Sequence, residues 1–204
     1  MRITNIEKNK GTRYTVFVDG EYFYILDSQI IADYSLKVGS ECTPELLEEI
    51  LLSAQRRKAK ERALYLLEYR DHSYAELVKK LEKSVDYEIA VETADKMVRY
   101  GFINDERYCK RLAHNYMTVK HWGAYRVRSE LYKKGFSKEL ISEAVDECLE
   151  TVDIYQIIRE LIEKKYLKYL TDIKGVKKTT DALVRMGHSY SDVKEVVSEY
   201  TDEF

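Results

Sequence analysis

The sequence is poor in the residues that staple a fold or interrupt it. It has three cysteines and one proline in 204 residues, and no two cysteines form a CxxC pair. Cys42, Cys109 and Cys148 are odd in number and widely spaced, which indicates small core residues in a reducing compartment rather than a disulfide framework. A chain of this length buries roughly 70% of its unfolded surface, so it needs no such staple.

Membrane and catalytic signals are also missing. No apolar run approaches the length of a membrane span, and the amino terminus does not resemble a signal peptide, so we expect a cytoplasmic protein with no membrane partner. The sequence lacks the Walker, GxGxxG, GxSxG and HExxH motifs. His114 and His121 lie seven residues apart and could form a ligand pair, but surface histidines are the favoured interpretation. We therefore expect no enzymatic activity, no metal and no cofactor.

Three further features have a chemical alternative to a structural role. Cys109 beside basic residues could carry a lowered thiol pKa, although its helical phase favours the core. Asp71, His72 and Ser73 could belong to a catalytic triad, but a turn that enters a helix is simpler. Tyrosine is abundant, with 18 residues against 5 phenylalanines, and packing at the core and its rim is favoured over base stacking.

The first residues have the pattern of a small sheet. Residues 13–18 and 21–26 are β-rich runs, and the Asp19-Gly20 pair between them is a strong two-residue hairpin signal. Residues 2–7 are expected to add a third strand. Three short strands are marginal alone, so the sheet should pack against the helices that follow.

From Ser28 onward the pattern becomes helical. Thr43 as N-cap and Pro44 at the first helical position begin a run without breakers to Arg70, which is compatible with one helix or with two bent near Ser53. A capping box from Ser73 to Glu76 opens a short helix to about residue 83. The remaining helices are expected at about 86–100, 104–122, 124–134, 137–150, 153–174, 176–186 and 189–200.

Internal repetition sets the expected architecture. Gly123 and Gly135 recur 52 positions later as Gly175 and Gly187, within segments of similar pattern. The sequence therefore predicts a mainly α fold with three tandem three-helix repeats in a curved array, preceded by a small N-terminal antiparallel β segment. The expected boundaries are a β cap at 1–40 and helical repeats at 41–103, 104–151 and 152–204.

The middle repeat is strongly basic. Residues 99–138 carry ten basic and three acidic side chains, whereas the whole chain has a net charge of -2. A solvated helix face usually mixes both signs, so this concentration favours a surface for phosphates or for an acidic protein. On a helical wheel the basic residues of 107–114 lie opposite an apolar stripe of Tyr108, Leu112, Tyr116 and Val119. The candidate binding residues are Arg107, Lys110, Arg111, His114, Lys120, Arg126, Arg128, Lys133 and Lys134.

Three segments carry a family resemblance. They are YGFINDERY at 100–108 with Ala113 beyond it, GAYRVRSELYKKG at 123–135, and YRDHSYAEL at 69–77. They resemble the signature of the RecX family of bacterial regulators of the RecA recombinase. The resemblance covers about residues 55–200 and, more loosely, the β segment. Cys109 stands where the family usually has alanine, which is a small-for-small change.

The resemblance implies a modular monomer that lies in the groove of the RecA filament on single-stranded DNA and acts in DNA repair, recombination and the SOS response. Such proteins block filament growth and restrain ATP hydrolysis, strand exchange and co-protease activity, without catalysis or cofactor of their own. The family's basic contact surface maps here onto Arg107, Lys110, Arg111, Arg126, Lys133 and Lys134. The alternatives are a helical protein that binds nucleic acid directly without RecA, for which weak DNA contact is expected, and an adaptor for another acidic protein.

Overall fold

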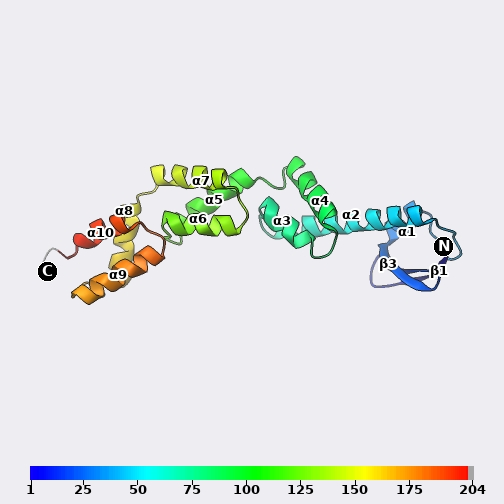
Figure 1. The fold of residues 1–204 in the computed structure, drawn as a ribbon, viewed down its shortest axis with the longest axis horizontal. Coiled ribbons are helices and arrows are strands. Elements are labelled where there is room, and N and C mark those ends of the chain that lie inside the picture. The colour runs from blue at the N-terminus through cyan, green and yellow to red at the C-terminus, as the bar shows by residue number, and fades with distance from the viewer. Residues whose placement is uncertain (202–204) are drawn as a thin grey trace. The chain divides into compact units, whose positions relative to one another are not determined.

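The computed structural model describes residues 1–201, and the chain divides into two compact units. The N-terminal unit comprises Met1–Arg70 and Leu77–Tyr100, and the C-terminal unit comprises Asp71–Glu76 and the chain from Gly101 onward. Figure 1 shows both units as ribbons, mainly helical with a sheet near the amino terminus. Within residues 1–201, no helix is long and apolar enough to cross a lipid bilayer.

The predicted sheet is present in the N-terminal unit. Its strands β1 (Ile3–Lys8), β2 (Arg13–Val18) and β3 (Glu21–Asp27) are antiparallel in the order β1-β2-β3. The hairpin between β2 and β3 turns at Asp19 and Gly20, which have φ values of 50° and 88°. Both central residues of the turn therefore have positive φ, which is the reason for the Asp-Gly signal in the sequence.

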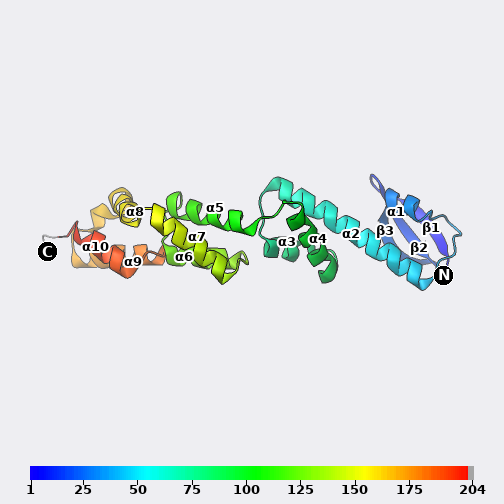
Figure 2. The same cartoon turned by 90° about the horizontal axis from the view of Figure 1, so that it is seen from above.

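Two helices cover the sheet and complete its core. They are the short α1 (Ser28–Asp33) and the long α2 (Pro44–Tyr69), seen beside the strands in Figure 2. Ile3, Val16 and Leu26 of the sheet belong to one apolar cluster with Ile50 and Ala54 of α2. α2 is a single 26-residue helix with no break near Ser53, which settles the choice that the sequence left open.

α3 (Tyr74–Leu81) and α4 (Tyr87–Arg99) follow α2. The predicted capping box is formed, because the Ser73 hydroxyl accepts from the amide of Glu76 and the Glu76 carboxylate accepts from the amide of Ser73. Gln55 of α2 is hydrogen-bonded through both its amide oxygen and its amide nitrogen to Asp86, the residue before α4. This pair fixes the start of α4 against α2.

The middle repeat is a bundle of α5 (Asp105–Thr118), α6 (Ala124–Lys133) and α7 (Lys138–Thr151), which lie side by side in Figures 1 and 2. The predicted helix to Trp122 is too long: α5 ends at Thr118, and His121 has a φ of 54° in the turn that follows. Consequently Val119, which the wheel placed in the apolar stripe, is 67% exposed.

The core side of α5 is also rotated from the predicted stripe. Cys109, Ala113 and Met117 are fully buried, while Leu112 is only half-buried. α5 packs most extensively on α7, and the small side chains of Cys109 and Ala113 suit this contact. Helical phase correctly favoured the core for Cys109, but the predicted stripe did not include Ala113 and Met117.

The third repeat differs most from prediction. α8 (Ile154–Leu161) passes into a π-helical turn η1 (Ile162–Tyr166) and a 3-10 turn η2 (Leu167–Tyr169), and α9 (Ile173–Arg185) and α10 (Tyr190–Ser198) follow. The predicted helix at 153–174 is therefore wrong beyond its first half. Gly175 does not separate two helices, because it lies inside the first turn of α9, where its amide donates to the N-cap Asp172. Its missing side chain leaves room for the carbonyl of Tyr169.

Close backbone contacts join the second and third repeats within the C-terminal unit. The amide of Gly123 donates to the carbonyl of Met186, and the amide of Tyr125 donates to the carbonyl of Gly187. A Cβ on Gly123 would overlap the backbone of Gly187 and His188. The start of α6 therefore rests directly on the turn between α9 and α10.

The start of α3 rests in the same way on the turn between α6 and α7. The Ser73 hydroxyl donates to the carbonyl of Lys134, and a Cβ on Gly135 would overlap the side chain of Ala75. Gly135 and Gly187 both have positive φ, at 82° and 92°, so they are true counterparts in the repeat. The counterpart of Gly123 before α9 is instead its N-cap, Asp172, which explains the wrong helix boundary predicted at Gly175.

Candidate functional site

The structure divides the nine predicted binding residues by the surroundings of their side chains. One group lies around the ends of α5 and α6, beside three aromatic rings. A second group faces the acidic helix α7 and is neutralised there. The first group consists of Arg111, Lys120, Arg126 and Lys134. The second consists of Lys110 and Arg128. Of the other three, Arg107 and His114 are exposed on α5 and Lys133 is exposed at the end of α6.

Trp122 is the centre of the first group. The Lys120 ammonium lies 4.5 Å from the centroid of the Trp122 ring, and the Arg126 guanidinium carbon lies 4.2 Å from it. The ring of Tyr116 lies 5.0 Å from the Trp122 ring, and Lys120 is also 4.7 Å from the Tyr116 ring. These distances are within the range of cation–π attraction, which holds both cations over the aromatic surface.

Tyr108 continues this aromatic surface toward the start of α3. Arg111 and Lys134 lie 5.4 Å and 5.8 Å from the centroid of its ring. Lys134 also forms an ion pair at 3.0 Å with Glu76, and Arg111 forms one with Asp71. Burial opposes the charge on Lys134, but the hydrogen bond that its ammonium donates to Glu76, together with the attraction of that carboxylate, outweighs burial and raises the pKa of Lys134. We call Tyr108, Tyr116 and Trp122, with the four cations of the first group, the aromatic–cation surface.

Lys110 is held by acidic side chains, chiefly from α7. Its ammonium lies 2.9 Å from a Glu143 oxygen, 3.1 Å from Glu147 and 3.2 Å from Glu106. The hydrogen bond to Glu143, followed by those to the other two carboxylates, raises its pKa above the ordinary lysine value. Arg128 pairs with Asp146 of the same helix at 2.6 Å. The charges of Lys110 and Arg128 therefore act mainly to hold α7 against the bundle.

The positive charge that remains available comes from fewer residues. Among residues 1–201, Arg107, Lys120 and Arg126 have no carboxylate within ion-pair distance. Lys133 pairs with Glu130 at 2.8 Å, which lowers the pKa of that carboxyl, with smaller contributions from Arg126 and Lys120. Unpaired cations such as Lys120 and Arg126, held over the half-buried ring of Trp122, can bind phosphate oxygens.

The structure also bears on the chemical alternatives. Cys109 is fully buried, and burial, followed by repulsion from Asp105, raises the pKa of its thiol to about 12, so it stays protonated at neutral pH. The Ser73 hydroxyl accepts a hydrogen bond from the amide of Glu76 and donates one to the carbonyl of Lys134, so it serves the helix start and not a catalytic triad. In the described part of the chain, no three His, Cys, Asp or Glu side chains are placed to hold a metal ion.

The aromatic part of this surface was not predicted from the sequence. The sequence pattern assigned Tyr108 and Tyr116 to the core stripe and gave Trp122 no role. Tyr108 and Tyr116 are nearly buried in the bundle, at 8% exposure each, yet their rings still have cations beside them. The available signal was the only tryptophan of the chain, which stands between Lys120 and Arg126 at a predicted helix end.

A buried histidine lies at the junction of the second and third repeats. His188 is 2% exposed, and its Nε2 lies 3.1 Å from the carbonyl of His121. If Nε2 carries the proton, Nδ1 is left without a hydrogen-bond partner among the described residues. Burial lowers the pKa of His188 below 6.5, despite the opposing hydrogen bond with His121.

We therefore expect the free energy of unfolding to fall as the pH drops below about 6.5. Below that pH the unfolded chain takes up a proton on His188 that the folded chain does not. The stability that neutral His188 preserves above pH 6.5 is therefore lost as the pH falls toward the folded-state pKa of this histidine. Urea unfolding at pH 7.5 and 5.5 measures this effect. His188→Gln, which keeps a donor for the His121 carbonyl, should reduce the pH dependence, whereas exposed His114→Gln should leave it unchanged. Equal pH dependence in both variants would contradict the assignment.

Comparisons with known proteins agree with this architecture. Residues 1–43 match the model for the regulatory protein RecX N-terminal domain, residues 59–101 the first RecX three-helix domain, and residues 104–145 the second. The regulatory protein RecX of Clostridioides difficile is 28% identical over 97% of this chain and 94% of its own length. That of Caldanaerobacter subterraneus is 29% identical over 81% of this chain and 84% of its own.

Solved structures show the same fold. A crystal structure of regulatory protein RecX aligns with a TM-score of 0.67 and 23% identity, covering 100% of this chain and 99% of that one. The crystal structure of RecX from Lactobacillus salivarius aligns with a TM-score of 0.63 and 21% identity, covering 74% of this chain and 99% of that one. With a sheet and two three-helix domains matched in chain order, the chain belongs to the RecX family of regulatory proteins.

Proposed function

We propose that this protein regulates the RecA recombinase by binding, as a monomer in the cytoplasm, in the groove of the RecA filament on single-stranded DNA. Binding would block filament growth and lower ATP hydrolysis, strand exchange and co-protease activity, with no turnover by this protein itself. Its setting would be DNA repair, recombination and the SOS response. The family membership supports a regulatory role, and the resemblance of residues 100–135 to RecX motifs supports RecA as the target.

The observation that carries the proposal is the aromatic–cation surface with its unpaired cations. Arg126 and Lys120 are held over Trp122, so their guanidinium and ammonium groups lose less freedom on binding than those of mobile surface side chains. Arg107 adds an exposed charge one turn before Arg111 on α5. Such a surface suits acidic side chains of RecA and phosphates of the bound strand, and weak direct contact with DNA is expected.

The test is RecA-dependent ATP hydrolysis on single-stranded DNA, titrated with this protein at two salt concentrations. Inhibition should follow the ratio of this protein to filament and should weaken at higher salt, because the ionic contacts are screened. Inhibition that accumulates with time at trace amounts would point to an enzyme instead. Tight binding to bare DNA with no effect on RecA would favour the direct nucleic-acid alternative, and the absence of both effects would favour an adaptor.

A further inference from the structure

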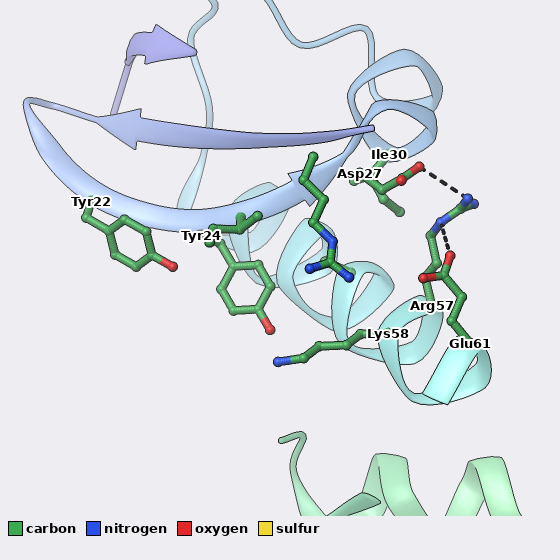
Figure 3. Close-up of a pocket in the computed structure, with 10 residues that line it drawn as sticks. Tyr22, Tyr24, Asp27, Ile30, Arg57, Lys58 and Glu61 are labelled. Carbon is green, nitrogen blue, oxygen red and sulfur yellow. Dashed lines mark ion pairs between the residues drawn. The ribbon is translucent and has the colours of Figure 1, made fainter. Parts of the chain in front are cut away.

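The N-terminal unit carries a second basic surface that the charge of the middle repeat does not explain. β2, β3, α1 and α2 enclose a pocket of about 220 Å³, and Figure 3 shows the side chains that line it. A second hollow adjoins it, sharing Arg13, Lys58 and Glu61 and extending to Lys80 and Lys83 around the end of α3. We call the two hollows together the α2 groove.

The charge of the α2 groove is strongly one-sided. Its lining contains two carboxylates, from Asp27 and Glu61. Both form ion pairs at 3.2 Å with Arg57, shown by the dashed lines in Figure 3. The six cations of the lining are Arg13, Arg57, Lys58, Arg62, Lys80 and Lys83. Within residues 1–201, the five other than Arg57 have no carboxylate within ion-pair distance. The groove therefore presents positive charge that the protein does not itself neutralise.

Aromatic rings accompany these cations. Tyr22 and Tyr24 lie two residues apart on β3 and project together into the pocket (Figure 3). Lys58 of α2 lines the same pocket, and its ammonium donates a hydrogen bond to the carbonyl of Ser84 at 3.0 Å, which orients it without neutralising its charge. Tyr22 is 58% exposed. Beyond Lys58 along α2, the Arg62 guanidinium lies 5.3 Å from the ring of Tyr65, which is 62% exposed. An exposed ring, Tyr22, and a half-buried one, Tyr24, on a strand beside unpaired cations match the stacking platforms of proteins that bind single strands.

We infer that the α2 groove binds single-stranded nucleic acid, with its lysines and arginines contacting phosphates and Tyr22 and Tyr24 stacking on bases. An acidic peptide would use the cations but would leave the exposed tyrosine rings without a matching group. A duplex would offer phosphates but not free base faces. The inference goes beyond the proposed function, because the site lies in a different unit and its ligand is bound without RecA.

Fluorescence anisotropy of a labelled oligothymidylate of about 15 nucleotides tests the charges with the full-length protein at low salt. Lys58→Glu with Lys80→Glu should weaken binding about ten-fold or more, because two phosphate contacts become repulsive. The matched control is Lys60→Glu with Lys79→Glu, which makes the same change in net charge on the same two helices, at exposed positions outside the groove lining. The control should bind within about two-fold of wild type.

A second pair of variants tests stacking. Tyr22→Ala should weaken binding about ten-fold, whereas Tyr22→Phe should retain it, since the ring and not the hydroxyl contacts the base. A duplex of the same length should compete poorly with the labelled strand. Thermal unfolding of each variant checks that it folds. If Lys58→Glu impairs folding, Lys83→Glu becomes the groove variant and Lys79→Glu its control.

Three outcomes would overturn the inference. No binding by the wild type at low salt, or equal loss in the groove and control variants, would show that the groove is not the site. Loss through the charges with none in Tyr22→Ala, together with full competition by polyglutamate, would identify an acidic protein as the partner instead. None of these measurements contains RecA, so their failure bears on direct DNA contact alone and leaves the proposed regulation of the RecA filament to its own ATPase test.

Discussion

Gly123→Ala is expected to loosen the third repeat from the second and to lower the free energy of unfolding by about 3 kcal/mol. Gly123 has an ordinary extended backbone, with φ at -74°, so alanine meets no conformational obstacle there. The cost arises from contact alone, because a Cβ would overlap the backbone of Gly187 and His188. To relieve this overlap, the start of α6 must move away from the turn between α9 and α10. That movement also stretches the hydrogen bonds of Gly123 to Met186 and of Tyr125 to Gly187.

Gly101→Ala is the matched control. Gly101 has a φ of 76° but no atom within 4 Å of an added Cβ, so alanine there costs only the backbone strain, about 1 kcal/mol. Urea unfolding followed by the fluorescence of Trp122, the only tryptophan and the neighbour of Gly123, compares the two variants. If both variants had the same urea midpoint, steric contact at Gly123 could not be what joins the repeats.

The two glycine pairs that suggested the repeat show what the sequence could and could not predict about the fold. The recurrence of Gly135 as Gly187 predicted a repeat correctly, because both residues follow the second helix of their bundle at positive φ. The recurrence of Gly123 as Gly175 did not hold, since one glycine precedes a helix and the other lies inside one. A sequence marks where a side chain is absent, but the atom that needs the space, such as the Tyr169 carbonyl at Gly175, comes from the fold.

Sequence patterns also predicted only part of the candidate binding site. Helical periodicity correctly grouped Arg107, Arg111 and His114 on one exposed face of α5. It placed Lys110 with them, although that ammonium is held by Glu143 and Glu147, more than thirty residues away on α7. Periodicity describes one helix at a time, so pairing between helices lies outside it. Trp122 lies in the loop between α5 and α6, where helical periodicity does not apply.

The α2 groove was missed for a related reason. Its cations come from β2, α2 and the end of α3, and no segment of the sequence holds more than a few of them. The run Arg56-Arg57-Lys58 in α2 was a local signal, but only the folded sheet brings Tyr22 and Tyr24 next to Lys58. By contrast, the charge of the middle repeat could be recognised because its basic residues all fall within one segment, residues 99–138.

Reversing charge at Arg107, Arg111 and Arg126 together is expected to abolish inhibition of RecA while the protein stays folded. Arg107 and Arg126 have no ion-pair partner in the part of the chain that the structure describes, so their loss removes binding groups and leaves no buried carboxylate unpaired. Arg111→Glu gives up a pair with Asp71 whose side chains are 59% and 41% exposed, which costs at most about 1 kcal/mol. Three reversed contacts, each repelling phosphate or carboxylate, should weaken filament binding by several orders of magnitude at low salt.

The control is Lys8→Glu, Lys10→Glu and Lys37→Glu, three exposed positions in the N-terminal unit that change the net charge equally. Both triple variants are titrated into the RecA ATPase assay at two salt concentrations, after circular dichroism and urea unfolding have shown that they fold. The control should inhibit as wild type does, and its inhibition should fall with salt in the same way. Full inhibition by the Arg107, Arg111 and Arg126 variant would show that the aromatic–cation surface does not contact the filament. Equal loss in both variants would instead mean that only the overall charge matters, because the two differ in where the charge lies and not in its amount.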